Sequence, residues 1–396
     1  ETKVTALENG QSYISHIPGA ATATAISEGQ FLPTTDFSKI AEVDAILICV
    51  PTPLGENQEP DLSYVVSTGE LIAQHMRASQ LVVLESTTYP GTSSEILKPI
   101  LEKNGLRSGE DLFLAYSPER EDPGNPNFAT ASIPKVVGGD GPDASTLATA
   151  LYDQIVVETI PVTSMEVAEA VKLTENIFRS VNIAMVNELK VIYDKMGIDI
   201  WEVIEAAKSK PFGYMPFYPG PGLGGHCIPI DPFYLTYRAK QFGEDTRFIE
   251  LAGEINTQMP AHVVGVLQAA LKEKSGSDLK GASILLIGLA YKKNVNDTRE
   301  SPAFMLMEIM ESQGAEVAYF DPFVPILPKT REHASFAGRK SIPWSPENIA
   351  QYDAALICTD HDDINYEELV THSKLVIDTR NATSSLQGHS DNIIKA

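Results

Sequence analysis

Short, uninterrupted apolar runs, each ended abruptly by polar residues or prolines, constrain the fold of this chain more than any other feature. The N-terminal part contains the runs Ala45–Val50, Leu81–Leu84, Leu112–Tyr116 and Lys135–Gly138. Continuous apolar strands that alternate with helices indicate a parallel sheet covered on both faces. Ligands of such a sheet bind beyond the carboxyl ends of its strands, so the polar residues that follow these runs are candidates for a site.

The last part of the chain repeats this pattern on a smaller scale. Asp353–Cys358 and Leu375–Thr379 resemble the first two runs, and Ser283–Gly288 opens the segment. The loop after this opening strand lacks the glycines of a GxGxxG motif and offers cations instead: Lys292, Lys293 and Arg299. Side-chain cations in place of a glycine cradle suggest a phosphate that is held by charge.

A long helix is predicted between the two sheets. Over Ser164–Met196, apolar residues recur at steps of three and four, and their coverage is broader than one stripe. Lys172 and Asn176 lie one turn apart on one face of this helix. We therefore predict an α/β protein with two Rossmann-like, doubly wound parallel-sheet domains, joined by a long central helix in a helical middle domain. The predicted domains span residues 1–162, 163–275 and 276–396.

The composition indicates a soluble globular protein and excludes several classes of function. With 396 residues and a formal net charge of −23, the chain lacks the basic surface that nucleic acids or anionic membranes require. No apolar run approaches the roughly 18 residues of a membrane span. Three cysteines make no disulfide framework. We expect a cytoplasmic protein in which Cys49 and Cys358, both within apolar runs, are core residues.

The stretch Lys210–Tyr237 concentrates glycines and prolines, which predicts an irregular segment rather than an ordinary helix or central strand. Cys227 follows the glycines directly, and Asp231 comes four residues later. A thiol near exposed backbone N–H groups is favoured as a thiolate nucleophile, and a nearby carboxylate can activate water. The alternative is that Cys227 is a small buried core residue, as most free cysteines are.

Several segments, in order along the chain, resemble the UDP-sugar 6-dehydrogenases, a family that oxidises a sugar-nucleotide alcohol twice to a carboxylate with NAD. These segments are ICVPTP, LEST, SPER, the Lys172/Asn176 helix, GGHCIPID and GLAYKKNVNDTRESPA. PGPGLGGHC and SPER are similar to the branch that uses UDP-N-acetylhexosamines, and IPIDPFYL and DTRFIELAGEIN are similar to the UDP-N-acetylglucosamine enzymes. The resemblance implies oxidation of UDP-N-acetyl-D-glucosamine to supply surface polysaccharide, with UDP-N-acetylmannosamine or UDP-glucose as alternative substrates.

The resemblance also implies roles for individual residues. The catalytic set is Cys227, Lys172, Asn176, Asp231, Thr87 and Glu119. The substrate-binding set is Arg120, Arg179, Gly222, Gly224, Gly225, Arg247, Tyr291 and Lys292. Arg247 would reach the site of a neighbouring subunit in a homodimer or a larger homo-oligomer. The NAD-binding set is Thr52, Thr87 and Arg299, and no His/Cys spacing suggests a metal site.

The glycine fingerprint of a dinucleotide fold is absent from the opening residues, ETKVTALENGQSYI. In the family this stretch lies just past the acid that holds the adenosine ribose, and about 30 residues with the glycine loop would precede it. We therefore expect the sequence to start inside the NAD-binding domain. The assignment of NAD rests on the resemblance and on residues further along the chain.

Two functions of other classes stay open. A cysteine hydrolase would use Cys227 with a distant histidine as base and would need no NAD, but it leaves the flanking parallel sheets unexplained. A non-catalytic nucleotide-sugar sensor would use the same fold. The joint presence of Lys172, Asn176, Cys227 and Asp231 argues against a sensor that has lost catalytic activity.

Overall fold

The structure is a computed structural model, and it describes residues 1–13, 17–55, 59–122, 128, 130–225, 227–330, 333–386 and 391–396. The side chains of Cys227 and Pro229 also lie outside this description. By its internal contacts the chain divides into two units. The N-terminal unit comprises residues 1–175 and 233–245, and the C-terminal unit comprises residues 176–232 and 246–396.

The N-terminal unit contains a five-stranded sheet with the strand order β1-β2-β3-β4-β5. Its strands are β1 Ala45–Ile48, β2 Leu81–Leu84, β3 Phe113–Tyr116, β4 Lys135–Gly139 and β5 Thr159–Val162. One strand differs from the predicted parallel arrangement, because β4 pairs antiparallel with β3. A parallel return needs a crossover of a dozen or more residues, usually a helix. Among the described residues between β3 and β4, the only regular element is the short 3₁₀ turn η4, Thr130–Ser132.

Helices cover both faces of this sheet because the side chains of a strand alternate between its faces. Leu84 of β2 packs in one buried cluster with Ile72 of α3, and the preceding Val83 packs in another with Tyr152 of α5. The helical elements up to β5 are α1 Thr2–Glu8, α2 Gly19–Ser27, η1 Phe37–Glu42, α3 Ser63–His75, η2 Thr92–Leu97, α4 Lys98–Leu101, η3 Glu102–Asn104 and α5 Pro142–Tyr152.

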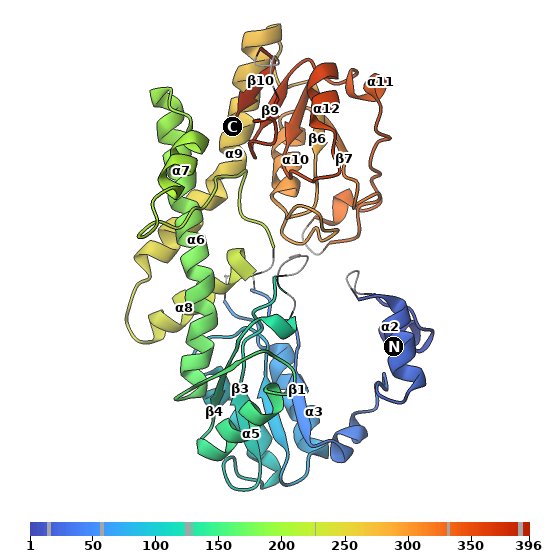
Figure 1. The fold of residues 1–396 in the computed structure, drawn as a ribbon, viewed down its shortest axis with the longest axis vertical. Helices are drawn as coiled ribbons and strands as arrows, with labels where there is room; N and C mark the ends of the chain where they lie inside the picture. The colour runs from blue at the N-terminus through green and yellow to red at the C-terminus, as the bar shows by residue number, and fades with distance from the viewer. Residues whose placement is uncertain are drawn as a thin grey trace. The chain divides into compact units, whose positions relative to one another are not determined.

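Long helices follow β5, and they are labelled in Figure 1. α6, Met165–Met196, is the 32-residue helix that the apolar periodicity predicts. α7 Ile200–Lys208, α8 Cys227–Gln241 and α9 Arg247–Ser275 come next. The division between the two units falls within α6 and within α8.

The C-terminal unit contains a second five-stranded sheet, which is parallel throughout and has the order β10-β9-β8-β6-β7. Its strands are β6 Ser283–Ile287, β7 Glu316–Phe320, β8 Ala354–Ile357, β9 Val376–Asp378 and β10 Ile393–Lys395. Since β6 lies between β7 and β8, the direction of winding reverses at β6. In doubly wound sheets, ligands bind in the crevice at the carboxyl ends of the strands at this switch point.

Buried apolar residues on both faces of the second sheet make its core. Leu286 packs on one side with Leu267 of α9 and Phe304 of α10, and Leu285 packs on the other with Leu369 of α12. The helical elements of this region after α9 are α10 Pro302–Ser312, η5 Ala334–Phe336, α11 Pro346–Ile349 and α12 Tyr366–His372 (Figure 1). The predicted pair of Rossmann-like sheets is thus confirmed.

The loop after β2 is held by a buried carboxylate of α6. Glu169 is 0% exposed and accepts hydrogen bonds from the Gly91 N–H at 2.6 Å, the Ser93 N–H at 2.9 Å and the Ser93 hydroxyl at 2.8 Å. Burial raises the pKa of Glu169 to about 7, because the bonds from Ser93 and Gly91 offset only part of the lost hydration. This carboxylate therefore fixes the loop that carries Thr87.

We expect Glu169→Gln to gain stability relative to the unsubstituted protein as the pH rises. The folded-state pKa of Glu169 is raised, so the stability it contributes is fully present below about pH 4.5 and is lost as the pH rises through about 7. Glutamine has no such proton to lose. The difference in unfolding free energy should therefore shift in favour of the variant by about 2.5 kcal/mol between pH 5 and pH 8, as measured by urea unfolding.

Glu166→Gln is the matched control on the same helix. Burial raises the pKa of Glu166, but the hydrogen bonds from Ser94, its own backbone and Ser164 outweigh this, so that its pKa is lowered. The stability that ionised Glu166 contributes to the fold is therefore present above about pH 4.5 and is lost only as the pH falls below that value. The control should show little change between pH 5 and pH 8, and a pH-independent difference for Glu169→Gln would contradict the prediction.

Candidate active site

The loops after β1 and β2 are joined at the carboxyl edge of the first sheet. The Thr52 hydroxyl donates to the Thr87 carbonyl at 2.8 Å. The Ser86 hydroxyl accepts from the Val50 N–H at 2.9 Å and donates to the Val50 carbonyl at 2.8 Å. Thr52 is buried and Thr87 is half-buried. The structure therefore brings these two predicted residues together at the edge where parallel strands bind ligands.

A buried cation that the sequence analysis missed lies near these strand ends. Lys135 opens β4, is 6% exposed, and its Nζ lies 3.3 Å from Glu85 and 3.2 Å from Glu119. Burial raises the pKa of Glu119, but Lys135 and the backbone N–H groups of Glu121 and Arg120 outweigh this and lower it. The predicted catalytic residue Glu119 is thus a carboxylate at neutral pH. The only signal in the sequence was a lysine at the start of an apolar run.

Lys172 is held within the N-terminal unit by the main chain of Glu119. Lys172 is 6% exposed, and its Nζ donates to the Glu119 carbonyl. The neighbouring Arg120 donates to the Pro134 carbonyl at 2.7 Å and forms an ion pair with Glu175 at 2.6 Å. The structure therefore groups three predicted residues, Lys172, Glu119 and Arg120.

Asn176 and Asp231 form a buried pair in the C-terminal unit. Asn176 is 0% exposed and Asp231 is 2% exposed, and the Asn176 Nδ2 donates to an Asp231 carboxylate oxygen. The exposed Arg179, on the next turn of α6, donates to the Asn176 Oδ1. Both amide atoms of Asn176 are thus engaged, which fixes its orientation against the carboxylate. Lys172 precedes Asn176 by one turn of the same helix.

The end of the stretch Lys210–Tyr237 is helical, so the prediction of an irregular segment was wrong from Cys227 onward. α8 begins at Cys227 and contains Pro232. An interior proline removes one hydrogen bond of a helix and disfavours the preceding turn, but here the helix continues through it. His226 and the Cys227 side chain lie outside the described part of the chain, and the reactive thiol stays a prediction.

Glycine is required where the loop before α8 passes Tyr291. A Cβ on Gly224 would lie 2.9 Å from the Tyr291 Cβ, and one on Gly225 would lie 2.9 Å from the Tyr291 ring. Gly222 has a φ of +138°, and a Cβ there would lie 3.2 Å from Pro302. The structure thus brings these predicted substrate-binding glycines against the loop that follows β6, within one unit.

The predicted arginines Arg247 and Arg299 are exposed. Arg299 forms an ion pair with Asp297 of its own loop at 2.6 Å. Arg247 is the first residue of α9. Lys292 is half-buried in the loop after β6. The roles of Arg247, Arg299 and Lys292 stay predictions.

The two remaining cysteines differ in burial. Cys358, at the end of β8, is buried, as predicted, whereas Cys49 is exposed, and its prediction as a core residue was wrong. Cys49 follows β1, which is an edge strand of the sheet as described. Residues at the end of an edge strand have a neighbouring strand on one side only, so they are less buried than residues at the end of a central strand. The Cys49 thiol donates to Glu85 at 3.3 Å.

The groups at the first sheet suit a nicotinamide dinucleotide. Hydroxyls of Thr52 and Thr87 follow parallel strands, which is where such sheets bind dinucleotides.

Among the described residues, no group of three or more His, Cys, Asp or Glu side chains is placed to hold a metal ion. In the same part of the chain, every helix is too short or too polar to cross a membrane.

The chain matches three models of one protein family. Residues 1–156 match the NAD binding domain of the UDP-glucose/GDP-mannose dehydrogenase family, residues 166–258 match its central domain, and residues 285–385 match its UDP binding domain. The NAD match covers the sheet that carries Thr52 and Thr87, and the UDP match covers the switch point at β6.

Individual relatives agree with this assignment. The chain is 36% identical over 331 residues to the UDP-N-acetyl-D-glucosamine 6-dehydrogenase of Pseudomonas aeruginosa, a match that covers 83% of this chain and 76% of that enzyme. It is 36% identical over 362 residues to the UDP-N-acetyl-D-mannosamine dehydrogenase of Pyrococcus horikoshii, covering 90% and 82%. The solved structure of UDP-D-ManNAc dehydrogenase from Pyrococcus horikoshii matches with a TM-score of 0.87 and 32% identity, covering 100% of this chain and 90% of that one.

The family models cover most strands of both sheets and much of the long helices, and two relatives above 30% identity span most of the chain. The chain therefore belongs to the UDP-glucose/GDP-mannose dehydrogenase family of NAD-dependent oxidoreductases.

Proposed function

We propose that this enzyme oxidises carbon 6 of a UDP-N-acetylhexosamine twice, from the alcohol to the carboxylate, and that its preferred substrate is UDP-N-acetyl-D-glucosamine. The observation that carries the proposal is the buried Asn176–Asp231 pair, whose carboxylate lies one turn into the helix that begins at Cys227. In this proposal Cys227 is the nucleophile, Asn176 is the amide donor and Asp231 is the carboxylate that a covalent two-step oxidation needs. The names of both relatives support an N-acetylated substrate.

In the first oxidation, the substrate hydroxyl passes its proton through a water held by Asp231 to the Asp231 carboxylate, which releases it to solvent before the hydrolysis. The Asp231 carboxylate is buried and bonded to Asn176, so it presents its acceptor atoms in one orientation. Lys172 contributes a positive charge that favours the developing alkoxide. Bound NAD+ supplies the hydride acceptor for both oxidations, one molecule for each.

The Cys227 thiolate then attacks the aldehyde at carbon 6. A carbon–sulfur bond forms, and the carbonyl oxygen becomes the oxyanion of a thiohemiacetal. Cys227 is the first residue of α8, and the unpaired N–H groups at a helix N-terminus favour a thiolate. Lys172 and Asn176 donate to the oxyanion, and one such donor is typically worth about 3 kcal/mol.

The second oxidation leaves a thioester on Cys227, which water hydrolyses. Asp231 takes a proton from the attacking water, the carbon–sulfur bond breaks, and the sulfur leaves as a thiolate. Thr87 and Glu119 support this step, and the lowered pKa of Glu119 keeps its carboxyl group ionised. Because the substrate stays covalently bound, no free aldehyde has to leave between the oxidations.

The UDP part binds to the C-terminal unit in this proposal. Tyr291 and Lys292 follow β6 at the switch point of the second sheet, which supports a nucleotide site there. Arg120, Arg179 and the backbone amides of Gly222, Gly224 and Gly225 contact the sugar and the diphosphate. On the cofactor side, Thr52, Thr87 and Arg299 would hold NAD+.

The substitution Cys227→Ala should abolish uronic acid formation while leaving the affinity for the UDP-sugar within a few-fold, because the thiol makes few ground-state contacts. Cys49→Ala is the control. Cys49 is an exposed residue, but the partial loss of water around its sulfur and the Glu85 carboxylate raise the pKa of its thiol to about 12. The thiol is therefore not ionised at neutral pH, and its loss should leave activity intact. NADH absorbance and chromatography of the product measure both. Uronic acid formation by Cys227→Ala at a near-normal rate would rule out the thioester route.

For substrate choice, we expect kcat/KM to decrease from UDP-N-acetylglucosamine to the N-acetylmannosamine and N-acetylgalactosamine epimers, and then to UDP-glucose. A pocket that hydrogen-bonds an acetamido group leaves its own polar groups unpaired when the substrate lacks one, and such rejection can be large. Parallel NADH assays on the four substrates decide the order. A preference for UDP-glucose would refute the N-acetylhexosamine assignment, whereas a preference for the manno epimer would refute only the choice of epimer.

We also propose that the enzyme is a homodimer or larger homo-oligomer in which Arg247 completes the neighbouring site. Arg247 begins α9 together with Phe248 and Leu251, which are 78% and 53% exposed, and exposed apolar residues around a cation suit a subunit interface. Arg247→Ala and Cys227→Ala should each have little activity alone. Mixed subunits should regain activity, because one hybrid site then holds both native residues. An absence of recovery in verified mixed oligomers would contradict the proposal.

A further inference from the structure

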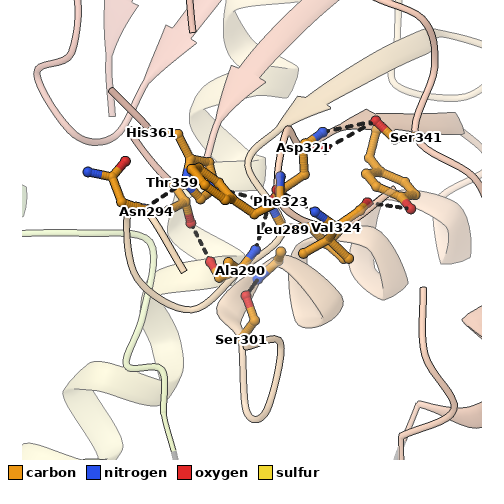
Figure 2. Close-up of polar contacts among 12 residues, drawn as sticks. Leu289, Ala290, Asn294, Ser301, Asp321, Phe323, Val324, Ser341, Thr359 and His361 are labelled. Atoms are coloured by element: carbon orange, nitrogen blue, oxygen red, sulfur yellow. Dashed lines mark hydrogen bonds and ion pairs between the residues drawn. The ribbon is translucent and has the colours of Figure 1, made fainter. Parts of the chain in front are cut away.

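The loop that follows β6 is fixed by a buried carboxylate at the end of β7. Asp321 is 2% exposed, and its Oδ2 accepts hydrogen bonds from the N–H groups of Leu289 at 2.6 Å and Ala290 at 3.0 Å. Its Oδ1 accepts from the N–H groups of Phe323 at 2.7 Å and Val324 at 3.0 Å. Figure 2 shows Asp321 grouped with Leu289, Ala290, Phe323 and Val324. The carboxylate therefore ties the start of the loop to the end of the neighbouring strand.

These backbone groups occupy a position that dinucleotide-binding sheets use for ligands. Directly after the first strand of such a sheet, loop and helix N–H groups hold phosphate. Here the N–H groups of Leu289 and Ala290 already donate to Asp321, so the protein's own carboxylate takes the role of a bound anion. A ligand phosphate at this switch point must then be held by residues further along the loop, and the next two are Tyr291 and Lys292.

His361 connects the far side of the same loop to Asp321. His361 is 0% exposed, its Nε2 lies 3.0 Å from the Asp321 Oδ2, and its Nδ1 accepts from the Asn294 N–H at 2.9 Å (Figure 2). Because Nδ1 is an acceptor, the proton of the neutral ring lies on Nε2 and is donated to Asp321. Asn294 has a φ of +61°, a conformation that residues other than glycine seldom adopt.

Two residues that follow β8 hold both sides of the segment Tyr291–Lys292. On one side, the Thr359 hydroxyl donates to the Ala290 carbonyl at 2.6 Å. On the other side, His361 accepts from Asn294. Both β8 contacts come from residues just beyond the carboxyl end of that strand. Hydrogen bonds therefore fix the main chain at Ala290, before the segment, and at Asn294, after it, next to the β6/β8 switch point.

We propose that the buried Asp321–His361 pair positions Tyr291 and Lys292 for binding the diphosphate end of UDP. Both are positioning residues that act through the loop and do not touch the ligand. The inference rests on the proposed binding of UDP by the C-terminal unit. It adds that UDP affinity depends on a hydrogen-bond network buried beneath the binding loop.

Substitutions of His361 separate this role from general stability. His361→Leu removes both bonds of the ring, and we expect the Kd for UDP to rise at least about tenfold, a tenfold change being about 1.4 kcal/mol. His361→Asn can keep an acceptor near Nδ1 for the Asn294 N–H and loses the donor to Asp321, so an increase of about threefold is expected. Isothermal titration of the chain with UDP measures both values.

The matched control is Ser283→Ala, at the opposite end of β6. The Ser283 hydroxyl donates to Asp353 at 3.0 Å and joins β6 to the segment before β8 far from the loop. This variant should lose stability and keep its affinity for UDP. In the enzyme assay, the His361 variants should raise the KM for the UDP-sugar while kcat stays within about threefold, because no group at the reacting carbon changes.

The outcomes distinguish this inference from the proposed function. If the unsubstituted chain does not bind UDP, both fail. If it binds UDP and a folded His361→Leu, checked by circular dichroism, binds equally well, only the positioning role fails. Should His361→Leu not fold, His361→Asn decides, and an unchanged Kd for that variant overturns the inference.

Discussion

At the carboxyl edge of each sheet, a buried carboxylate accepts hydrogen bonds from the backbone N–H groups of a neighbouring loop. Glu169 does so for the loop after β2, and Asp321 for the loop after β6. Asp378, at the end of β9, accepts from three N–H groups of the turn that follows it. Loop N–H groups at a sheet edge have no strand to pair with, and buried donors need acceptors. A single buried carboxyl group satisfies several of them at once, which gives these loops one defined conformation.

Buried lysines place positive charge inside the N-terminal unit of this acidic chain. The chain carries a formal net charge of −23, yet Lys135 and Lys172 are each only 6% exposed. Lys135 lies between Glu85 and Glu119, and Lys172 donates to the Glu119 carbonyl. Both cations thus converge on one short segment after β3. At short range the local charge, and not the net charge, decides how an anion interacts with an acidic protein.

The local periodicity of the sequence was enough to predict most elements. The apolar runs became β1, β2, β3, β4, β6, β8 and β9, and the period of 3.6 became the 32-residue α6. The residues that carry the family motifs could also be named in advance. Thr52 with Thr87, Lys172 with Glu119, and Asn176 with Asp231 are joined by hydrogen bonds in the structure. Pattern-based prediction failed at α8, where glycine and proline content outweighed the helical continuation from Cys227.

Only the tertiary structure showed which polar groups meet. Lys135 is about 50 residues from Glu85, and Asp321 is about 40 from His361, so neither pairing leaves a periodic signal. The antiparallel β4, the exposure of Cys49 and the left-handed Asn294 likewise depend on neighbours distant in the chain. The sequence by itself determined most of the helices and strands and named the candidate residues of the site, because these follow from local spacing and residue type. The tertiary structure decided how those residues are held, because a buried polar group needs a partner that any part of the chain can supply.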